Sequence, residues 1–357
     1  MKAGKVGSMA VVLSVLAALL ASACGGGQPA DTAAAPQGAV LVINGAGATF
    51  PYPIYSKWFD EYHKSNPQTQ INYQSIGSGG GIRQVSNETV FFGATDGPMT
   101  DEQLKAAPGA LLHFPTVLGA DVPVYNLPGL SAELKFTGPL LADIFLGKVK
   151  KWNDPAIAKV NAGVTLPDTD ITVVHRSDGS GTTYIWVDYL SKVSPEWKEK
   201  VGVATSVNWP AGVGGKGNEG VAGLVSQTPG SIGYVELIYA LQNKILFGAV
   251  QNASGEFVKA TTESVTAAAA AAAASMPADF RVSITDAAGA GAYPVSSFTW
   301  LLLYEDPQDK AQSKAMVDFM KWALTDGQQF ASQLGYAPLP QDVVKQELVA
   351  LEKVKVQ

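Results

Sequence analysis

The chain has 357 residues, which exceeds the usual size of one hydrophobic core and therefore predicts two domains. Its hydrophobic content of 46% is that of a globular protein and excludes wholesale disorder. The formal net charge of -6 excludes nucleic acid as a partner, because duplex binding needs a basic face, but it leaves room for a small anion.

The first residues have the pattern of a targeting signal. Two lysines precede an apolar run at residues 9–20 that is too short to span a bilayer, and small residues then lead to Cys24. This stretch resembles the lipobox of bacterial lipoproteins. We expect residues 1–23 to be a signal peptide, Cys24 to carry the lipid, and residues 24–40 to be a flexible tether. The alternative is an ordinary signal peptide with an incidental cysteine.

Apolar runs alternate with segments of helical spacing along the rest of the chain. Predicted strands are residues 40–44, 71–76, 90–94, 122–127 (broken by a proline), 171–175, 231–235 and 293–304. Predicted helices are residues 52–65, 79–85, 100–107, 137–148, 182–193, 218–226, 266–275 and 310–325. Thr100 begins a capping-box pattern, and Asn218 is expected to cap its helix. The alternation predicts an α/β fold with mainly parallel pairing.

Four glycine-rich segments each follow a predicted strand, and at least three of them open a helix. They are residues 45–51, 77–82, 93–98 and 175–183. The first turn of a helix has unpaired N–H groups and a positive dipole end, and glycine lets a ligand come close to them. Hydroxyls and the guanidinium of Arg176 add further donors. Together these segments predict a small-anion or nucleotide site at the carboxyl ends of the strands.

Other sites do not fit the sequence. The chain has no phosphate-binding loop of the G-x-x-x-x-G-K-[ST] type, and Phe50 stands where a dinucleotide fingerprint needs its third glycine. His63, His113 and His175 are scattered and form no metal-ligand pattern. There is no G-x-S-x-G nucleophile elbow. We interpret His175 as a packed strand residue and expect no metal and no cofactor.

Residues 41–357 resemble the PstS family, the phosphate-binding proteins of phosphate ABC transporters. The matching stretches are GAGATFPYPIYSKW (45–58), YQSIGSGGGI (73–82), FGATDGPM (92–99), VHRSDGSGTT (174–183), GNEGVA (217–222), GSIGYVE (230–236) and YPVSSFTWLLLY (293–304). The sequence TDGP at 95–98 stands where the family often has SDAP, and the aspartate is kept.

The resemblance implies a type II periplasmic-binding-protein fold, with two α/β domains, a ligand cleft and two hinge crossovers. Residues 122–127 and 294–300 would be the crossovers. One domain would be residues 41–122 joined to 300–357, and the other would be residues 123–299.

The resemblance also implies a site and a role. The residues expected to bind phosphate are Thr49, Phe50 (through its backbone N–H), Ser78, Asp96, Arg176, Ser180, Gly181 and Thr182, while Asp178 holds Arg176 without touching the ligand. The expected function is extracytoplasmic capture of inorganic phosphate by a monomer, which passes it to the permease subunits of an ABC importer and is anchored to the membrane through Cys24.

Two alternatives remain. One is a phosphate-ester hydrolase with Asp96 or Ser180 as nucleophile, although no placed base is visible. The other is a binding protein for a different tetrahedral oxyanion, such as sulfate. An ionised aspartate only accepts hydrogen bonds, so Asp96 favours a ligand that carries a proton, as hydrogen phosphate does.

Overall fold

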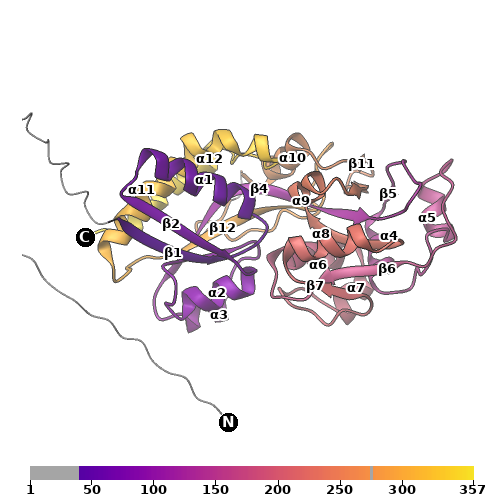
Figure 1. The fold of residues 1–357 in the computed structure, drawn as a ribbon, viewed down its shortest axis with the longest axis horizontal. Coiled ribbons are helices and arrows are strands. Elements are labelled where there is room, and N and C mark those ends of the chain that lie inside the picture. Colours follow the sequence, from indigo (N-terminus) through magenta and orange to yellow (C-terminus); the bar gives the residue numbers. More distant parts are fainter. Residues whose placement is uncertain (1–39, 274–275) are drawn as a thin grey trace, which may run out of the picture. The chain divides into compact units, whose positions relative to one another are not determined.

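The computed structural model describes residues 40–273 and 276–357 (Figure 1). The predicted signal peptide, Cys24 and nearly all of the predicted tether lie outside the described residues. So does the end of the helix predicted at 266–275.

The first half of the main sheet has the strand order β2-β1-β3-β12-β4. Its strands are β1 (Leu41–Gly47), β2 (Thr69–Ser75), β3 (Phe92–Thr95), β4 (Leu111–Tyr125) and β12 (Ser296–Tyr304). Strands β1, β2 and β3 pair in parallel, whereas β12 is antiparallel to both of its neighbours. Every residue of β12 is buried, as expected for a central strand covered on both faces.

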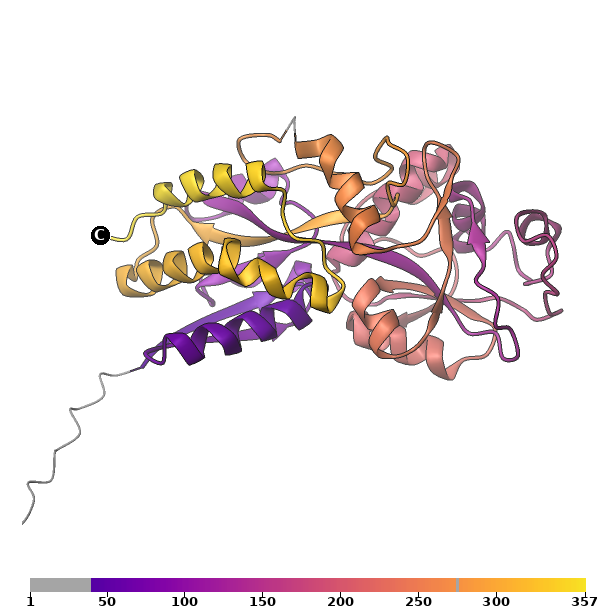
Figure 2. The same cartoon turned by 90° about the horizontal axis from the view of Figure 1, so that it is seen from above.

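Helices cover both faces of this half of the sheet. They are α1 (Tyr52–Ser65), α2 (Ser78–Ser86), α3 (Asp101–Ala106), α11 (Lys310–Leu324) and α12 (Gln341–Ala350), with short 3-10 turns η1 (Asp326–Phe330), η2 (Ser332–Leu334) and η3 (Leu351–Lys353). Figure 1 shows α1, α11 and α12 on one side of β1 and β2, and α2 and α3 on the other, and Figure 2 shows the first three from above.

The second half of the sheet continues in the order β4-β8-β6-β7, and β9 also pairs with β4. Its elements are α4 (Gly138–Phe145), α5 (Pro155–Val160), β6 (Thr172–Arg176), α6 (Gly181–Val193), α7 (Pro195–Lys200), β7 (Val213–Gly215), α8 (Gly217–Gln227), β8 (Ser231–Glu236), α9 (Leu237–Gln242), β9 (Leu246–Phe247) and α10 (Thr262–Ala273). A small sheet joins β5 (Lys135–Phe136), β10 (Ala249–Gln251) and β11 (Phe257–Val258).

Strand β4 links the two halves. It pairs with β12 as far as Ala120 and with β8 from Asp121 onward. The prediction of a strand at residues 122–127 is confirmed as far as Tyr125, but its start and the break at Pro123 are wrong, because β4 is one continuous strand that begins at Leu111. The register between β4 and β12 shifts next to Pro115, so this proline, which has no N–H for the ladder, lies at an irregularity of the pairing.

The prediction of alternating strands and helices is confirmed, and so is the capping box of Thr100 and Gln103 at the start of α3. The prediction that Asn218 caps a helix is wrong. The cap of α8 is Lys216, which makes no side-chain capping bond, and Asn218 lies inside the first turn. Its side chain instead bonds to residues far away in the sequence, as described below.

Candidate functional site

The predicted site residues lie at strand ends and helix starts. Thr49 and Phe50 follow β1, Ser78 begins α2, and Asp96 follows β3. Arg176 ends β6, Ser180 is the N-cap of α6, and Gly181 and Thr182 begin that helix. All eight are buried. Because β1 and β3 are parallel neighbours and β6 is parallel to β7 and β8, the turns after them gather polar groups at the carboxyl ends of strands.

The start of α6 lies directly against Ser78 and Asp96. A β carbon placed on Gly181 would be 2.4 Å from Ser78 Oγ and 2.5 Å from Asp96 Oδ2. A second close contact joins the glycine turns, where the Gly79 N–H donates to Gly179 O over 2.9 Å. The start of α2, which follows β2, therefore meets the turns that follow β3 and β6. The sequence predicts that these segments lie together.

Arg176 is buried and forms a bidentate ion pair with the partly buried Asp178. Arg176 Nε donates to Asp178 Oδ1 over 2.8 Å, and Nη2 donates to Oδ2 over 2.6 Å. The Gly217 N–H also donates to Oδ1 over 3.0 Å. Burial alone would raise the pKa of Asp178, but the hydrogen bonds and charge of Arg176 outweigh it and hold that pKa below its usual range. This carboxylate fixes the guanidinium and leaves Nη1 to donate elsewhere.

Asp96 is the carboxylate placed among these donors. Its Oδ1 accepts a 2.7 Å hydrogen bond from Thr299 Oγ1, and Ser78 Oγ lies 3.4 Å from its Oδ2. Its backbone N–H donates to Ser78 Oγ over 3.1 Å. Burial raises the pKa of Asp96 to about 7, against the opposing effects of the Thr299 hydrogen bond and the Arg176 charge. The carboxyl group therefore changes its protonation state near neutral pH.

The turn after β1 is held by two tyrosine hydroxyls. Tyr239 donates to Thr49 O over 2.5 Å, and Tyr336 donates to Phe50 O over 2.6 Å. The ring of Phe50 is fully buried and packs near Tyr336. Its ring thus belongs to the core, so only the backbone of Phe50 is available to a ligand.

Sequence reasoning missed three groups that contact the site: Thr299, Asn218 and Tyr239. Asn218 Nδ2 donates to both Thr49 Oγ1 and Thr182 Oγ1, over 2.7 Å and 3.0 Å. Thr299 lies in the middle of β12, in a stretch that the sequence marks only as an apolar strand. Each of these contacts joins residues 36 to 203 positions apart, so no local pattern indicates them.

His175 is a packed residue at the end of β6. Its ring stacks on Trp209 with 4.8 Å between centroids, and Nδ1 lies 3.0 Å from Arg176 O. Burial lowers the pKa of His175. Across residues 40–273 and 276–357, no cluster of three His, Cys, Asp or Glu side chains is placed to hold a metal ion. In the same ranges, no helix has the length and apolar character needed to span a membrane.

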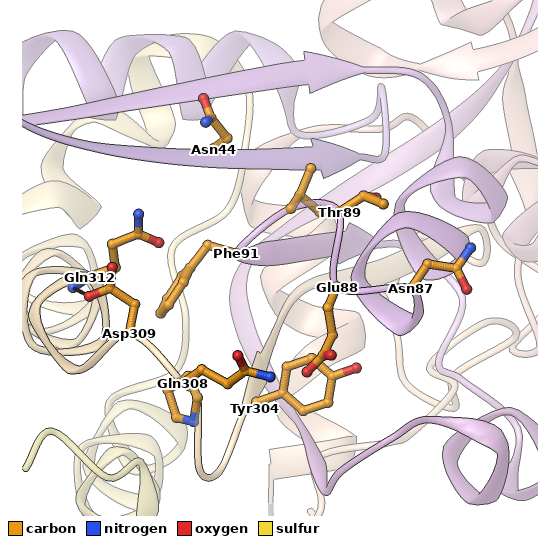
Figure 3. Close-up of a pocket in the computed structure, with 11 residues that line it drawn as sticks. Asn44, Asn87, Glu88, Thr89, Phe91, Tyr304, Gln308, Asp309 and Gln312 are labelled. Atoms are coloured by element: carbon orange, nitrogen blue, oxygen red, sulfur yellow. Dashed lines mark hydrogen bonds between the residues drawn. The ribbon is translucent and has the colours of Figure 1, made fainter.

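A separate surface cavity of about 550 Å³ lies between β1, the turn before β3 and the start of α11 (Figure 3). Asn44, Glu88, Asp309 and Gln312 line it, together with seven other residues that include no lysine or arginine. With two carboxylates and no cationic side chain, this cavity does not suit an anion. None of the eight predicted site residues lines it.

Comparisons with known proteins agree with this fold. The PBP superfamily domain matches residues 26–327. A phosphate-binding protein PstS of Xylella fastidiosa is 53% identical over 305 residues, which cover 85% of this chain and 83% of that protein. A phosphate-binding protein PstS of Pasteurella multocida is 51% identical over 304 residues, covering 85% of this chain and 88% of that protein.

A solved structure of a high affinity periplasmic phosphate-binding protein, bound with phosphate, has a TM-score of 0.69 and 22% identity. The likeness covers 87% of this chain and 93% of that one. The chain is a member of the PBP superfamily, and the predicted type II periplasmic-binding-protein fold is confirmed. Within that superfamily, it belongs to the PstS family of phosphate-binding proteins.

Proposed function

We propose that the protein binds inorganic phosphate and delivers it to an ABC-type import permease. The observation that carries this proposal is the contact between the start of α6, with Arg176 beside it, and the single carboxylate of Asp96. Donors from several turns suit an oxyanion, and one buried acceptor suits the proton that hydrogen phosphate carries. The names of the relatives support the same ligand.

The proposed ligand contacts come from both halves of the sheet. Thr49, the backbone N–H of Phe50, Ser78 and Asp96 come from the first half. Arg176, Ser180, Gly181 and Thr182 come from the second half, and Asp178 orients Arg176. Because a helix N-terminus, hydroxyls and a guanidinium all favour negative charge, these groups together replace the water that surrounds free phosphate.

The arrangement favours binding over phosphate-ester hydrolysis. Ser180 Oγ accepts the Thr183 N–H over 3.0 Å as a helix cap, and the nearest histidine in sequence, His175, is stacked on Trp209. A hydrolase with Ser180 as nucleophile needs a base within hydrogen-bond reach of that hydroxyl. We therefore propose a binding protein without catalytic activity, like the substrate-binding proteins of its family.

We also propose that the two halves move as domains, residues 41–122 with 300–357 and residues 123–299, which close on phosphate about the crossover strands β4 and β12. Small-angle scattering of the protein with and without saturating phosphate tests this motion. A decrease in the radius of gyration supports it, and an unchanged profile opposes it.

The proposed location is the outer face of the membrane, with a lipid on Cys24 as anchor. The sequence of the first 24 residues supports this proposal. Replacing Cys24 by alanine should abolish lipid attachment and move the protein out of the membrane fraction. If the variant keeps the same lipid mass and stays with the membrane, the anchor is elsewhere.

A calorimetric titration with phosphate, sulfate and glucose 6-phosphate tests the binding function. We expect tight, one-to-one binding of phosphate alone, with no release of phosphate from the ester. Absence of phosphate binding contradicts the proposal, and turnover of glucose 6-phosphate favours the hydrolase instead.

A further inference from the structure

Asn218 is a fully buried asparagine whose amide orientation is fixed by the surrounding backbone. The Glu236 N–H donates to Asn218 Oδ1 over 2.9 Å. Because that N–H can only donate, the oxygen of the amide must face Glu236 and the NH2 group must face the site. The NH2 group then donates to Thr49 Oγ1 over 2.7 Å and to Thr182 Oγ1 over 3.0 Å.

Each of the two threonine hydroxyls receives a second hydrogen bond. The backbone N–H of Asn218 donates to Thr49 Oγ1 over 3.2 Å. Arg176 Nη1 donates to Thr182 Oγ1, also over 3.2 Å. A hydroxyl has two acceptor positions and one proton. With both acceptor positions occupied by N–H donors, each hydroxyl has only its own proton left to offer.

We propose that Asn218 is a positioning residue that determines specificity, because it makes Thr49 and Thr182 obligate hydrogen-bond donors. Ligand oxygens at these two positions must then be unprotonated. The ligand's proton is directed to Asp96, the acceptor that lies beside Gly181. The inference rests on the proposed function and deepens it: the site takes an oxyanion whose protonated oxygen occupies one fixed position.

Asn218 also joins the two halves of the fold. Thr49 follows β1 in the first half, whereas Thr182 begins α6 in the second half, and one NH2 group bonds to both. The two hydroxyls therefore reach their donor geometry together, when the halves are in contact. The amide acts through the hydroxyls and has no direct contact with the ligand in this account.

The test is a double-mutant cycle between Asn218→Ala and Thr182→Val, with phosphate affinity of the full chain as the readout. Valine has nearly the shape of threonine and lacks the hydroxyl. In the wild-type background, Asn218→Ala should weaken phosphate binding about 10- to 100-fold, because the two hydroxyls proposed to bond to the charged ligand both lose the donor that orients them. In the Thr182→Val background, the fold-loss of phosphate affinity caused by Asn218→Ala should be at least about threefold smaller, because the Thr182 hydroxyl that Asn218 orients is already absent.

A matched control is Asn161→Ala. Asn161 is also buried, and its side chain bonds only to the backbone of Lys135 and Ile157. This variant should lower Tm without changing phosphate affinity by more than about threefold. Equal fold-losses for Asn218→Ala in both backgrounds would show a merely structural role and overturn the inference.

A second variant covers the case in which Asn218→Ala does not fold. Asn218→Asp keeps an oxygen for the Glu236 N–H but presents acceptors to both threonine hydroxyls, which should weaken phosphate binding at least about tenfold. Affinity equal to wild type would overturn the inference. If the wild-type protein itself does not bind phosphate, the proposed function is wrong. If wild type binds phosphate and an Asn218 variant binds it equally well, only the role proposed for Asn218 is wrong.

Discussion

The hydroxyl of Thr299 donates a 2.7 Å hydrogen bond to Oδ1 of Asp96, and it thereby joins the central strand β12 to the turn after β3. Both residues are buried. Since Thr299 occupies Oδ1, the other oxygen, Oδ2, is the one that lies beside Gly181 and Ser78. The carboxylate thus presents one oxygen to the fold and the other to the candidate site.

Replacing Thr299 by valine should weaken phosphate binding about tenfold, because Asp96 loses the hydrogen bond that orients it and favours its ionised form. Calorimetric titration from pH 6 to pH 8 measures the effect, which should be largest at the acidic end. The matched control is Thr116→Val. Thr116 bonds to Tyr55 and to the backbone of Thr299 but not to Asp96. Equal losses in the two valine variants would contradict the role given to Thr299.

The raised pKa of Asp96 predicts how the stability of the folded protein depends on pH. Burial raises that pKa from 3.8 to about 7, so the folded protein binds more protons than the unfolded chain between these two values. Its contribution to stability is therefore present at acidic pH and is lost as pH rises toward 7. Without ligand, Asp96→Asn should raise Tm at pH 8 by at least about 3 °C, and the gain should shrink toward pH 5. A gain that grows toward pH 5 contradicts this sign.

Gly181 tests the close approach between α6 and Asp96. An added methyl group would overlap Ser78 Oγ and Asp96 Oδ2, so Gly181→Ala should weaken phosphate binding about 10- to 100-fold. The control is Gly223→Ala in α8, where an added β carbon meets nothing within 4 Å. The control should keep its affinity and gain about 0.5–1 kcal/mol of stability from better helix propensity. Wild-type binding by Gly181→Ala contradicts the proposed site.

Arg176 and Asp178 should differ in how strongly they affect the ligand. Arg176→Ala removes the only guanidinium among the eight proposed ligand contacts and should weaken phosphate binding about 100-fold or more. Asp178→Asn keeps one acceptor for Arg176 and should cost only about tenfold. Affinities from fluorescence or calorimetry decide the order. If Asp178→Asn is as damaging as Arg176→Ala, Asp178 does more than orient the arginine.

Local patterns in the sequence predict much of this fold and site. The four glycine-rich turns are visible because each follows an apolar strand. In the structure all four lie together: the Gly77 N–H donates to Gly47 O, the Ala48 N–H to Ala94 O and the Gly79 N–H to Gly179 O. The length of β4 could not be predicted, since two prolines interrupt its apolar pattern and only pairing with β12 and β8 holds it extended. The local sequence predicts Asn218 as a helix cap. That prediction fails because the side chain bonds instead to Thr49 and Glu236, and these bonds depend on tertiary contacts.

The most direct test of the account is calorimetric titration of wild type and Asp96→Asn with phosphate and with sulfate at pH 7.5. A site built to accept a ligand proton rejects an analogue without one by roughly 10⁴–10⁵. We predict that wild type binds phosphate and shows no heat of binding with sulfate. Asp96→Asn should reduce the difference in affinity between the two anions, mainly by binding sulfate more tightly. Equal preference for phosphate over sulfate in the two proteins would contradict the role of Asp96 as the acceptor of the ligand's proton.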